Sequence, residues 1–298
     1  MISILTPTYN RGYILHNAYQ SLCNQSIFDF EWIIVDDGSM DNTEKLVESW
    51  KKECNAFPII YRKQENGGKH RAINKGVSYV HAEYVLILDS DDFLEENAVE
   101  LIHKWVASIK DLNGFAGVSG LRGWINKEGA IGGKINKEYI DATQLERRRY
   151  GLMGDKAEVY KTEILKKYPF PEFEGEKFLS ESAVWDRIAK DGYKIRWFNT
   201  IIYRCEYLED GLTNNTNSKV YVENFNGFTY CTKLNISTQS FFYKYLRIGY
   251  YISIAKLKKM HHRKICEVLG IKRIQILVGV IFYKSNCIRK NLFRKKKG

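Results

Sequence analysis

The stretch that decides the fold is Tyr84–Asp92, with the sequence YVLILDSDD. Its five leading apolar residues predict a buried strand, and the acidic cluster Asp89–Asp92 then falls at the carboxyl end of that strand. Open α/β sheets bind their ligands at this edge, and clustered carboxylates there suit Mg²⁺ or Mn²⁺ together with a diphosphate. The same residues are also typical of a polar turn that caps a helix beginning near Glu95.

Earlier segments repeat the pattern of a buried strand followed by polar turn residues. The pairs are Ile2–Thr6 with Pro7–Gly12 (PTYNRG), and Trp32–Val35 with Asp36–Ser39 (DDGS). Helix-like stretches follow at roughly 13–24 and 41–53, then a strand at Ile59–Arg62 and a helix opening at Asn66–Arg71 and running to about Tyr79. The alternation predicts an α/β fold with a mostly parallel sheet flanked by helices, so that the polar clusters share one edge.

Lys69 and Arg71 follow two glycines at the predicted start of the third helix. Backbone N–H groups and the helix dipole favour anions there, and the glycines allow close approach to the backbone. This favours phosphate binding over a merely solvated charged face.

Four ordered elements resemble those of family 2 glycosyltransferases, an inverting, metal-dependent class with the GT-A fold that uses nucleotide sugars. The elements are Thr6–Arg11 (TPTYNR), Val35–Asp41 (VDDGSMD), Gly67–Gly76 (GGKHRAINKG) and Leu88–Asp92 (LDSDD). Their order and spacing are more specific than any one of them. The resemblance covers about residues 1–212.

The resemblance implies roles for residues of the donor site. Tyr9 and the backbone near Pro7 flank a uracil ring, and Asp37 accepts from the edge of the base, although Asp37 is also an ordinary turn residue before Gly38. Asp91 binds the metal, and Asp89 belongs to the ribose or metal shell.

For the acceptor side, the resemblance implies that Glu181 is the catalytic base, because it stands at the family's spacing before Trp185. The chain departs from the family here, since Glu replaces Asp and Ser180 replaces the preceding carboxylate. The alternative is that Ser180 and Glu181 are a helix cap and first-turn residue. Proton removal from a sugar hydroxyl needs a carboxylate within hydrogen-bond reach, which favours the base.

Three further segments are interpreted from their loop-like sequence. Residues 122–134 are expected to form a loop, and Met153–Lys156 to precede a helix near the acceptor. Glu209–Thr213 resembles an element that closes over the donor in relatives, or else is a polar turn.

Charge is concentrated at the C-terminal end of the chain. From Phe241 onward there are 16 Lys and Arg against the single acid Glu267, a net +15 within a total of +11. The apolar segments 241–252 and 274–283 lie among these cations, as in helices on an anionic bilayer surface. A packed helical bundle and, less favoured, nucleic-acid binding are the alternatives.

The sequence thus predicts a GT-A catalytic domain over residues 1–240 and a basic helical C-terminal region over 241–298. It predicts transfer of a sugar from a nucleoside-diphosphate sugar, a UDP-sugar first, to a hydroxyl of a lipid-linked or cell-surface polysaccharide, with Mn²⁺ or Mg²⁺. Without an 18-residue apolar run or room for a signal peptide before the first strand, and with six scattered cysteines, we expect a cytoplasmic, peripherally membrane-bound protein. A nucleotidyltransferase and a non-catalytic binding module remain the alternatives.

Overall fold

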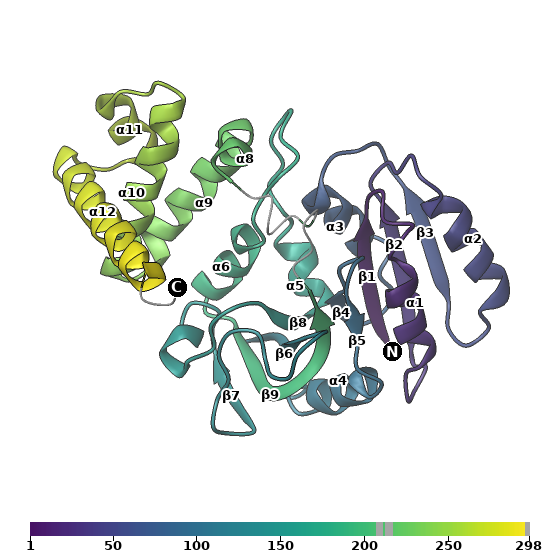
Figure 1. Cartoon of the computed structure of the whole chain (residues 1–298). Coiled ribbons are helices and arrows are strands. Elements are labelled where there is room, and N and C mark those ends of the chain that lie inside the picture. Colours follow the sequence, from purple (N-terminus) through teal and green to yellow (C-terminus); the bar gives the residue numbers. More distant parts are fainter. Residues whose placement is uncertain (207–210, 212–216, 296–298) are drawn as a thin grey trace. The chain divides into compact units, whose positions relative to one another are not determined.

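A single mixed sheet organises the N-terminal part of the chain (Figure 1). The computed structural model describes residues 1–206, 211 and 217–295, with the backbone alone for 288–295. The strands are β1 Ile2–Thr8, β2 Phe30–Asp36, β3 Ile59–Lys63, β4 Tyr84–Ile87, β5 Phe93–Leu94, β6 Phe115–Trp124, β7 Tyr139–Ala142, β8 Lys156–Lys161 and β9 Lys194–Cys205. Their order across the sheet is β3-β2-β1-β4-β8-β6-β9-β5, with β7 on β9.

The helices alternate with strands in the first part of the chain, as predicted, and follow one another directly in the C-terminal part. They are α1 His16–Cys23, α2 Thr43–Glu53, α3 Lys69–Val77, α4 Ala98–Ala107, α5 Thr162–Lys167, α6 Ser182–Lys190, α8 Ser218–Glu223, α9 Phe225–Thr238, α10 Phe241–Leu257, α11 His262–Leu269 and α12 Arg273–Lys295, with a 3₁₀ turn at Arg147–Tyr150. Among the described residues no helix is long and apolar enough to cross a membrane.

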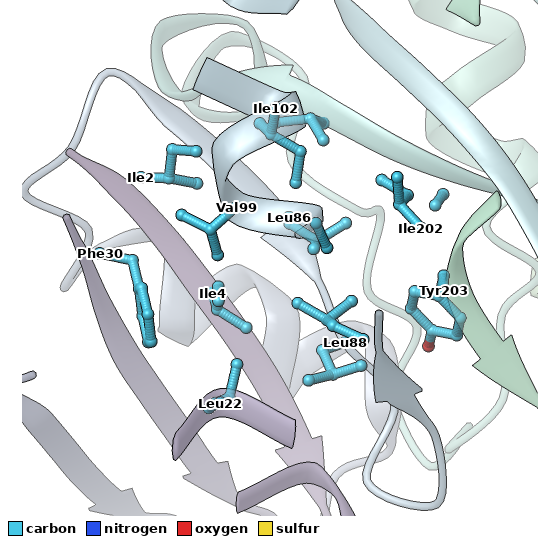
Figure 2. Close-up of a cluster of buried hydrophobic side chains, with 14 of the residues drawn as sticks. Ile2, Ile4, Leu22, Phe30, Leu86, Leu88, Val99, Ile102, Ile202 and Tyr203 are labelled. Carbon is cyan, nitrogen blue, oxygen red and sulfur yellow. The ribbon is translucent and has the colours of Figure 1, made fainter. Parts of the chain in front are cut away.

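The predicted parallel half of the sheet is confirmed. β1 pairs in parallel with β2 and with β4, and β2 pairs in parallel with β3. β1 and β2 are buried along their whole length, the pattern of strands covered on both faces. Ile2 and Ile4 join the core that α1, α2 and α4 cover (Figure 2), whereas Leu5 approaches Gly76 of α3.

The second half of the sheet is mixed, and two local predictions there are wrong. β8 pairs antiparallel with both β4 and β6, and β6 pairs in parallel with β9. The expected loop at residues 122–134 is therefore wrong at its start, because β6 continues to Trp124 and carries Arg122 inside the sheet. The helix expected after Met153–Lys156 is also wrong, since Lys156 begins β8.

The chain divides into two compact units, Met1–Phe170 with Ile188–Leu208, and Pro171–Arg187 with Glu209–Gly298. The predicted boundary at residue 240 instead falls between α9 and α10, which share one core. Phe228 of α9 stacks on Tyr251 of α10, with ring centroids 5.4 Å apart. Residues 217–240 therefore pack with the C-terminal helices.

The second unit is a helical bundle built on the close contact of α10 with α12. A Cβ at Gly249 would lie 2.1 Å from the carbonyl oxygen of Gly279, so only glycine allows this approach. Ile248, Tyr251 and Ile252 are buried in the bundle core. Part of the apolar surface of segment 241–252, which the sequence assigned to a bilayer surface, is therefore used inside the protein, whereas Phe241 and Phe242 are exposed.

Replacing Gly249 with Ala should destabilise the helical bundle although alanine is the better helix former. Overpacking of this kind costs about 1–3 kcal/mol, against about 1 kcal/mol of helix propensity gained. Urea unfolding measures the difference, with Ser253→Ala, a half-buried position on the same helix, as the matched control. A variant as stable as the wild type would show that the α10–α12 contact is looser than described.

Candidate active site

Asp37 organises the loop that leads into α3. Its buried carboxylate accepts from Gln64 Nε2 at 2.7 Å and Asn66 Nδ2 at 3.0 Å, and from the backbone N–H groups of Gly67 at 2.8 Å and Gly68 at 2.7 Å. A carboxylate offers about four acceptor positions, so these four hydrogen bonds use all of them. A uracil contact of Asp37 stays a prediction and would require one of these donors to leave.

The loops after β1 and β2 are joined to each other by side-chain to backbone hydrogen bonds. Asn10, in the left-handed region at φ 52°, accepts from Met40 N at 2.8 Å, and its own N–H donates to Ser39 Oγ at 2.8 Å. Pro7 lies within β1 and is buried, whereas Tyr9 is 46% exposed. Of the two residues predicted to flank the base, Tyr9 therefore offers an accessible aromatic face.

The first turn of α3 reaches the acidic cluster. Lys69 Nζ lies 2.5 Å from Asp89 Oδ1, so the residue predicted to bind phosphate is paired with the residue predicted for the ribose or metal shell. Arg71 donates from Nη1 to Gly67 O at 2.6 Å and closes the first turn of the helix. These contacts place a cation and the N-terminal end of α3 beside the carboxylates that follow β4.

Two residues that the sequence analysis did not assign complete the cluster. Arg122 of β6 lies 3.4 Å from Asp89 Oδ2 and 3.6 Å from Asp92 Oδ2, and its guanidinium stands 4.1 Å from the ring centroid of Tyr203. Tyr203 of β9 donates to Asp92 Oδ2 at 2.8 Å and accepts from the N–H of Asp89 at 2.9 Å. Both are positioning residues, because they hold the acidic turn against the sheet.

The three carboxylates differ in their electrostatic surroundings. Burial opposes the charged form of Asp89, but Lys69 and Arg122 outweigh it and hold the pKa of Asp89 below its usual range. Burial, and then the charge of Asp89, raise the pKa of Asp91, and the same two causes raise the pKa of Asp92 to about 8. The charged forms of Asp91 and Asp92 are therefore the ones that a further cation would stabilise.

This arrangement fits a divalent ion only if the substrate supplies part of its coordination shell. Within the described ranges, no group of three His, Cys, Asp or Glu side chains is arranged to hold a metal. Mg²⁺-type sites commonly use one or two carboxylates plus phosphate oxygens and water. Asp91 fits this role, since no Lys or Arg in the described part of the chain forms an ion pair with it.

Glu181 lies in the second unit, in the turn that opens α6. Its carbonyl oxygen accepts from Val184 N at 3.0 Å and Trp185 N at 3.1 Å, and its side chain is half-buried. The placement agrees with the helix-start alternative and leaves the base role open. Asp186, a second carboxylate of α6, is buried and accepts from Asn235 Nδ2 at 3.1 Å.

The segment before Glu181 is held to the start of α9 by four hydrogen bonds. Glu176 accepts from the N–H groups of Asn226 at 2.7 Å and Gly227 at 2.8 Å, and Asn224 Oδ1 accepts from the N–H groups of Lys177 and Phe178, both at 2.8 Å. A carboxylate at a helix N-terminus is stabilised by the dipole. Helix α9 thus fixes the backbone that carries Glu181. The other expected element, Glu209–Thr213, lies outside the described residues except for Gly211.

The comparisons with known proteins agree with this geometry. The profile described as "Glycosyl transferase family 2" matches residues 3–157, and the chain belongs to that family. Glycosyltransferase GlyG of Streptococcus pneumoniae is 36% identical over 107 residues, which are 36% of this chain and 35% of that protein. This chain therefore matches about a third of that relative's length.

Other relatives cover more of the chain. The GalNAc(5)-diNAcBac-PP-undecaprenol β-1,3-glucosyltransferase of Campylobacter jejuni is 26% identical, over 91% of this chain and 89% of that protein. The structure of S. aureus TarS 1–349 with UDP-GlcNAc superposes with a TM-score of 0.64 at 18% identity, covering 97% of this chain and 92% of that one. The mannosyltransferase PcManGT of Pyrobaculum calidifontis, solved with GDP-Man and Mn²⁺, gives 0.58 at 14% identity, covering 95% and 86%. The predicted GT-A fold is confirmed.

One buried cation gives the stability of this unit a distinct pH dependence. Lys156 is 1% exposed, and its Nζ donates to the carbonyl oxygens of Ile131 and Asp155 at 3.2 Å and of Met153 at 2.5 Å. Burial, and then the charge of Arg147, lower the pKa of Lys156 to about 8. The folded protein therefore loses this proton at lower pH than the unfolded chain does.

The Lys156→Met variant should lack a rise in stability that the wild type shows between pH 8 and about 10.5, because in that window the unfolded state binds the additional proton. The rise should reach roughly 3 kcal/mol at about 1.4 kcal/mol per pKa unit. Chemical unfolding at a series of pH values measures the difference from wild type, with the exposed Lys110→Met as control. Parallel pH curves for wild type and Lys156→Met would contradict a depressed pKa.

Proposed function

We propose that this protein is an inverting glycosyltransferase that moves a sugar from a nucleoside-diphosphate sugar, preferentially a UDP-sugar, to a hydroxyl of a lipid-linked or cell-surface polysaccharide. The observation that carries the proposal is the Lys69–Asp89 ion pair, which joins the N-terminus of α3 to the acidic turn after β4 in a chain of this family. An anion-binding helix end beside carboxylates is what a metal-bound diphosphate requires.

On the donor side, Lys69, Arg71 and the N–H groups at the start of α3 are proposed to bind the diphosphate, and Tyr9 to stack on the base. Asp91, with Asp89 beside it, is proposed to hold Mn²⁺ or Mg²⁺. When bound, the ion supplies positive charge that neutralises the departing nucleoside diphosphate. Arg122 and Tyr203 keep the acidic turn in place before the donor binds.

On the acceptor side, Glu181 is proposed to remove the proton from the acceptor hydroxyl as the oxygen attacks the anomeric carbon. The C–O bond to the diphosphate breaks as the new glycosidic bond forms, and attack from the opposite face inverts the anomeric configuration. A half-buried carboxylate on a clasped backbone suits this role, because general-base catalysis depends on fixed geometry.

The acceptor class and location rest on relatives and on charge. The Campylobacter relative is named for an undecaprenol-linked substrate, and the S. aureus relative TarP, 38% identical over 106 residues, is a poly(ribitol-phosphate) β-N-acetylglucosaminyltransferase. A hexosyl or N-acetylhexosaminyl donor is therefore the first choice. The basic C-terminal region supports action at the cytoplasmic face of the plasma membrane, in contact with anionic lipid.

The test is a donor screen that measures nucleoside diphosphate release from UDP-, GDP- and TDP-sugars with Mn²⁺ present. We expect release from UDP-sugars, increased by a polysaccharide or lipid-linked acceptor. Turnover of GDP- or TDP-sugars alone would overturn the donor assignment. Absence of turnover with every donor and acceptor would favour a binding module on the same fold.

Asp91→Asn should abolish metal-stimulated turnover while the protein stays folded, because Asp91 lies in a partly exposed turn and the amide is a poor ligand for a hard cation. Isothermal titration of UDP with and without Mn²⁺ measures the effect, and we expect the metal-dependent gain in affinity to vanish. The exposed Asp111→Asn is the matched control. Full activity of Asp91→Asn would remove Asp91 from the metal site.

Glu181→Gln should bind the donor normally and lose transfer by about a hundredfold or more, because the amide keeps the shape but cannot accept a proton. Single-turnover kinetics with acceptor present separate the chemical step from binding. Glu174→Gln, an exposed position in the same segment, is the control. If Glu181→Gln transfers sugar at the wild-type rate, the base lies elsewhere.

A further inference from the structure

Helix α12 is apolar on two opposite faces. Ile276 and Gly279 lie on the face that packs in the bundle, where Gly279 meets Ile248 and Gly249 of α10. At about 100° per residue, Ile274, Leu277 and Ile281 form a separate stripe on the other side. These three side chains, called here the outer face of α12, are 60%, 56% and 54% exposed.

The start of α10 extends this apolar surface. Phe241 and Phe242 are 66% and 46% exposed, and their ring centroids lie 6.0 and 5.7 Å from that of Phe282 on α12. Aromatic rings at the margin of an apolar stripe are typical of helices in the interfacial region of a bilayer. Phe282 follows Ile281 of the outer face, so the exposed rings of Phe241 and Phe242 lie near the C-terminal end of that face.

The charges around the outer face have one sign. Lys272, Arg273 and Lys284 are exposed on α12 or just before it, and Glu267 is the last acidic residue of the sequence. Two copies of this chain that paired through the outer face would bring these cations together, which disfavours self-association. A nucleic acid would meet the cations but would gain nothing from the apolar stripe between them.

We propose that the outer face of α12, with Phe241 and Phe242, is a membrane-docking surface for anionic phospholipid. The apolar side chains enter the boundary between headgroups and acyl chains, and the flanking lysines and arginine contact lipid phosphates. The proposal deepens the proposed function by assigning its membrane contact to particular residues. It also narrows the membrane contact of the basic C-terminal region to one face, since Ile248, Tyr251 and Ile252 of α10 are buried in the bundle.

Point substitutions test this surface better than removal of residues from 241 onward, which would strip Phe228 of its packing partner Tyr251. The combined variant Ile274→Ser, Leu277→Ser and Ile281→Ser changes only exposed side chains. Its co-sedimentation with vesicles of phosphatidylcholine and phosphatidylglycerol should fall at least about tenfold, because three apolar side chains that would leave water on binding are replaced by polar ones.

The controls separate the surface from general effects. Leu112→Ser removes an exposed leucine of the other unit and should bind vesicles as tightly as the wild type does. Leu277→Ser alone should bind vesicles more weakly than the wild type. Lys272→Gln with Lys284→Gln should lower binding at low salt and little at high salt. Circular dichroism should be unchanged in each variant.

Two outcomes would overturn the docking surface. One is equal vesicle binding by the wild type and the combined variant, including no binding by either. The other is a wild-type dimer in gel filtration that the combined variant dissociates, which would make the outer face an interface between copies. Donor turnover without vesicles is measured in parallel for every variant. If the combined variant loses vesicle binding but no form of the protein, wild type included, turns over any donor, the docking surface stands and the glycosyltransferase proposal is refuted.

Discussion

The parallel pairing of β1 with β2 on one side and β4 on the other is the constraint from which the site follows. Because parallel strands end at the same edge, the turns after all three strands meet there, although they are distant in sequence. β1 is buried throughout its length, so its register against both neighbours is set by core packing. A slip of one residue would move Ile4 to the opposite face of the sheet and displace the polar turns from one another.

The edge of the sheet concentrates negative charge, and the fold stabilises it with cations from two directions. Lys69 comes from the start of α3, and Arg122 comes from near the end of β6. Both contact Asp89, so Asp89 remains ionised in spite of burial while the pKa of Asp91 is raised. The protein thus stabilises the charge of one carboxylate internally, whereas burial and that same charge oppose ionisation of Asp91 and Asp92.

The second unit is held together by close helix packing and by side-chain to backbone hydrogen bonds, and not by a sheet. Glycines let α10 and α12 approach backbone to backbone, and a buried Glu176 and Asn224 clasp the segment before Glu181 to α9. Helix α9, which holds that segment, packs through Phe228 on Tyr251 of α10, one of the helices that the sequence associated with a membrane. One helix face remains for an outside partner, which explains how the same basic region both packs as a bundle and presents an apolar stripe.

The sequence by itself determined the elements whose signal is local. Uninterrupted apolar runs located β1 to β4, and the turn residues after them located Asp37, Lys69 and the acidic cluster. Arg122 and Tyr203 carried no such signal, because their contacts with Asp89 and Asp92 span 33 and 111 residues. Only the tertiary structure decided that Arg122 lies on a strand beside the carboxylates, that Asp37 is saturated by its own loop, and which side of α12 is buried. These three features depend on contacts between segments that are distant in sequence. Composition and periodicity show only which residues of a single segment are buried, and do not show which other segment covers them.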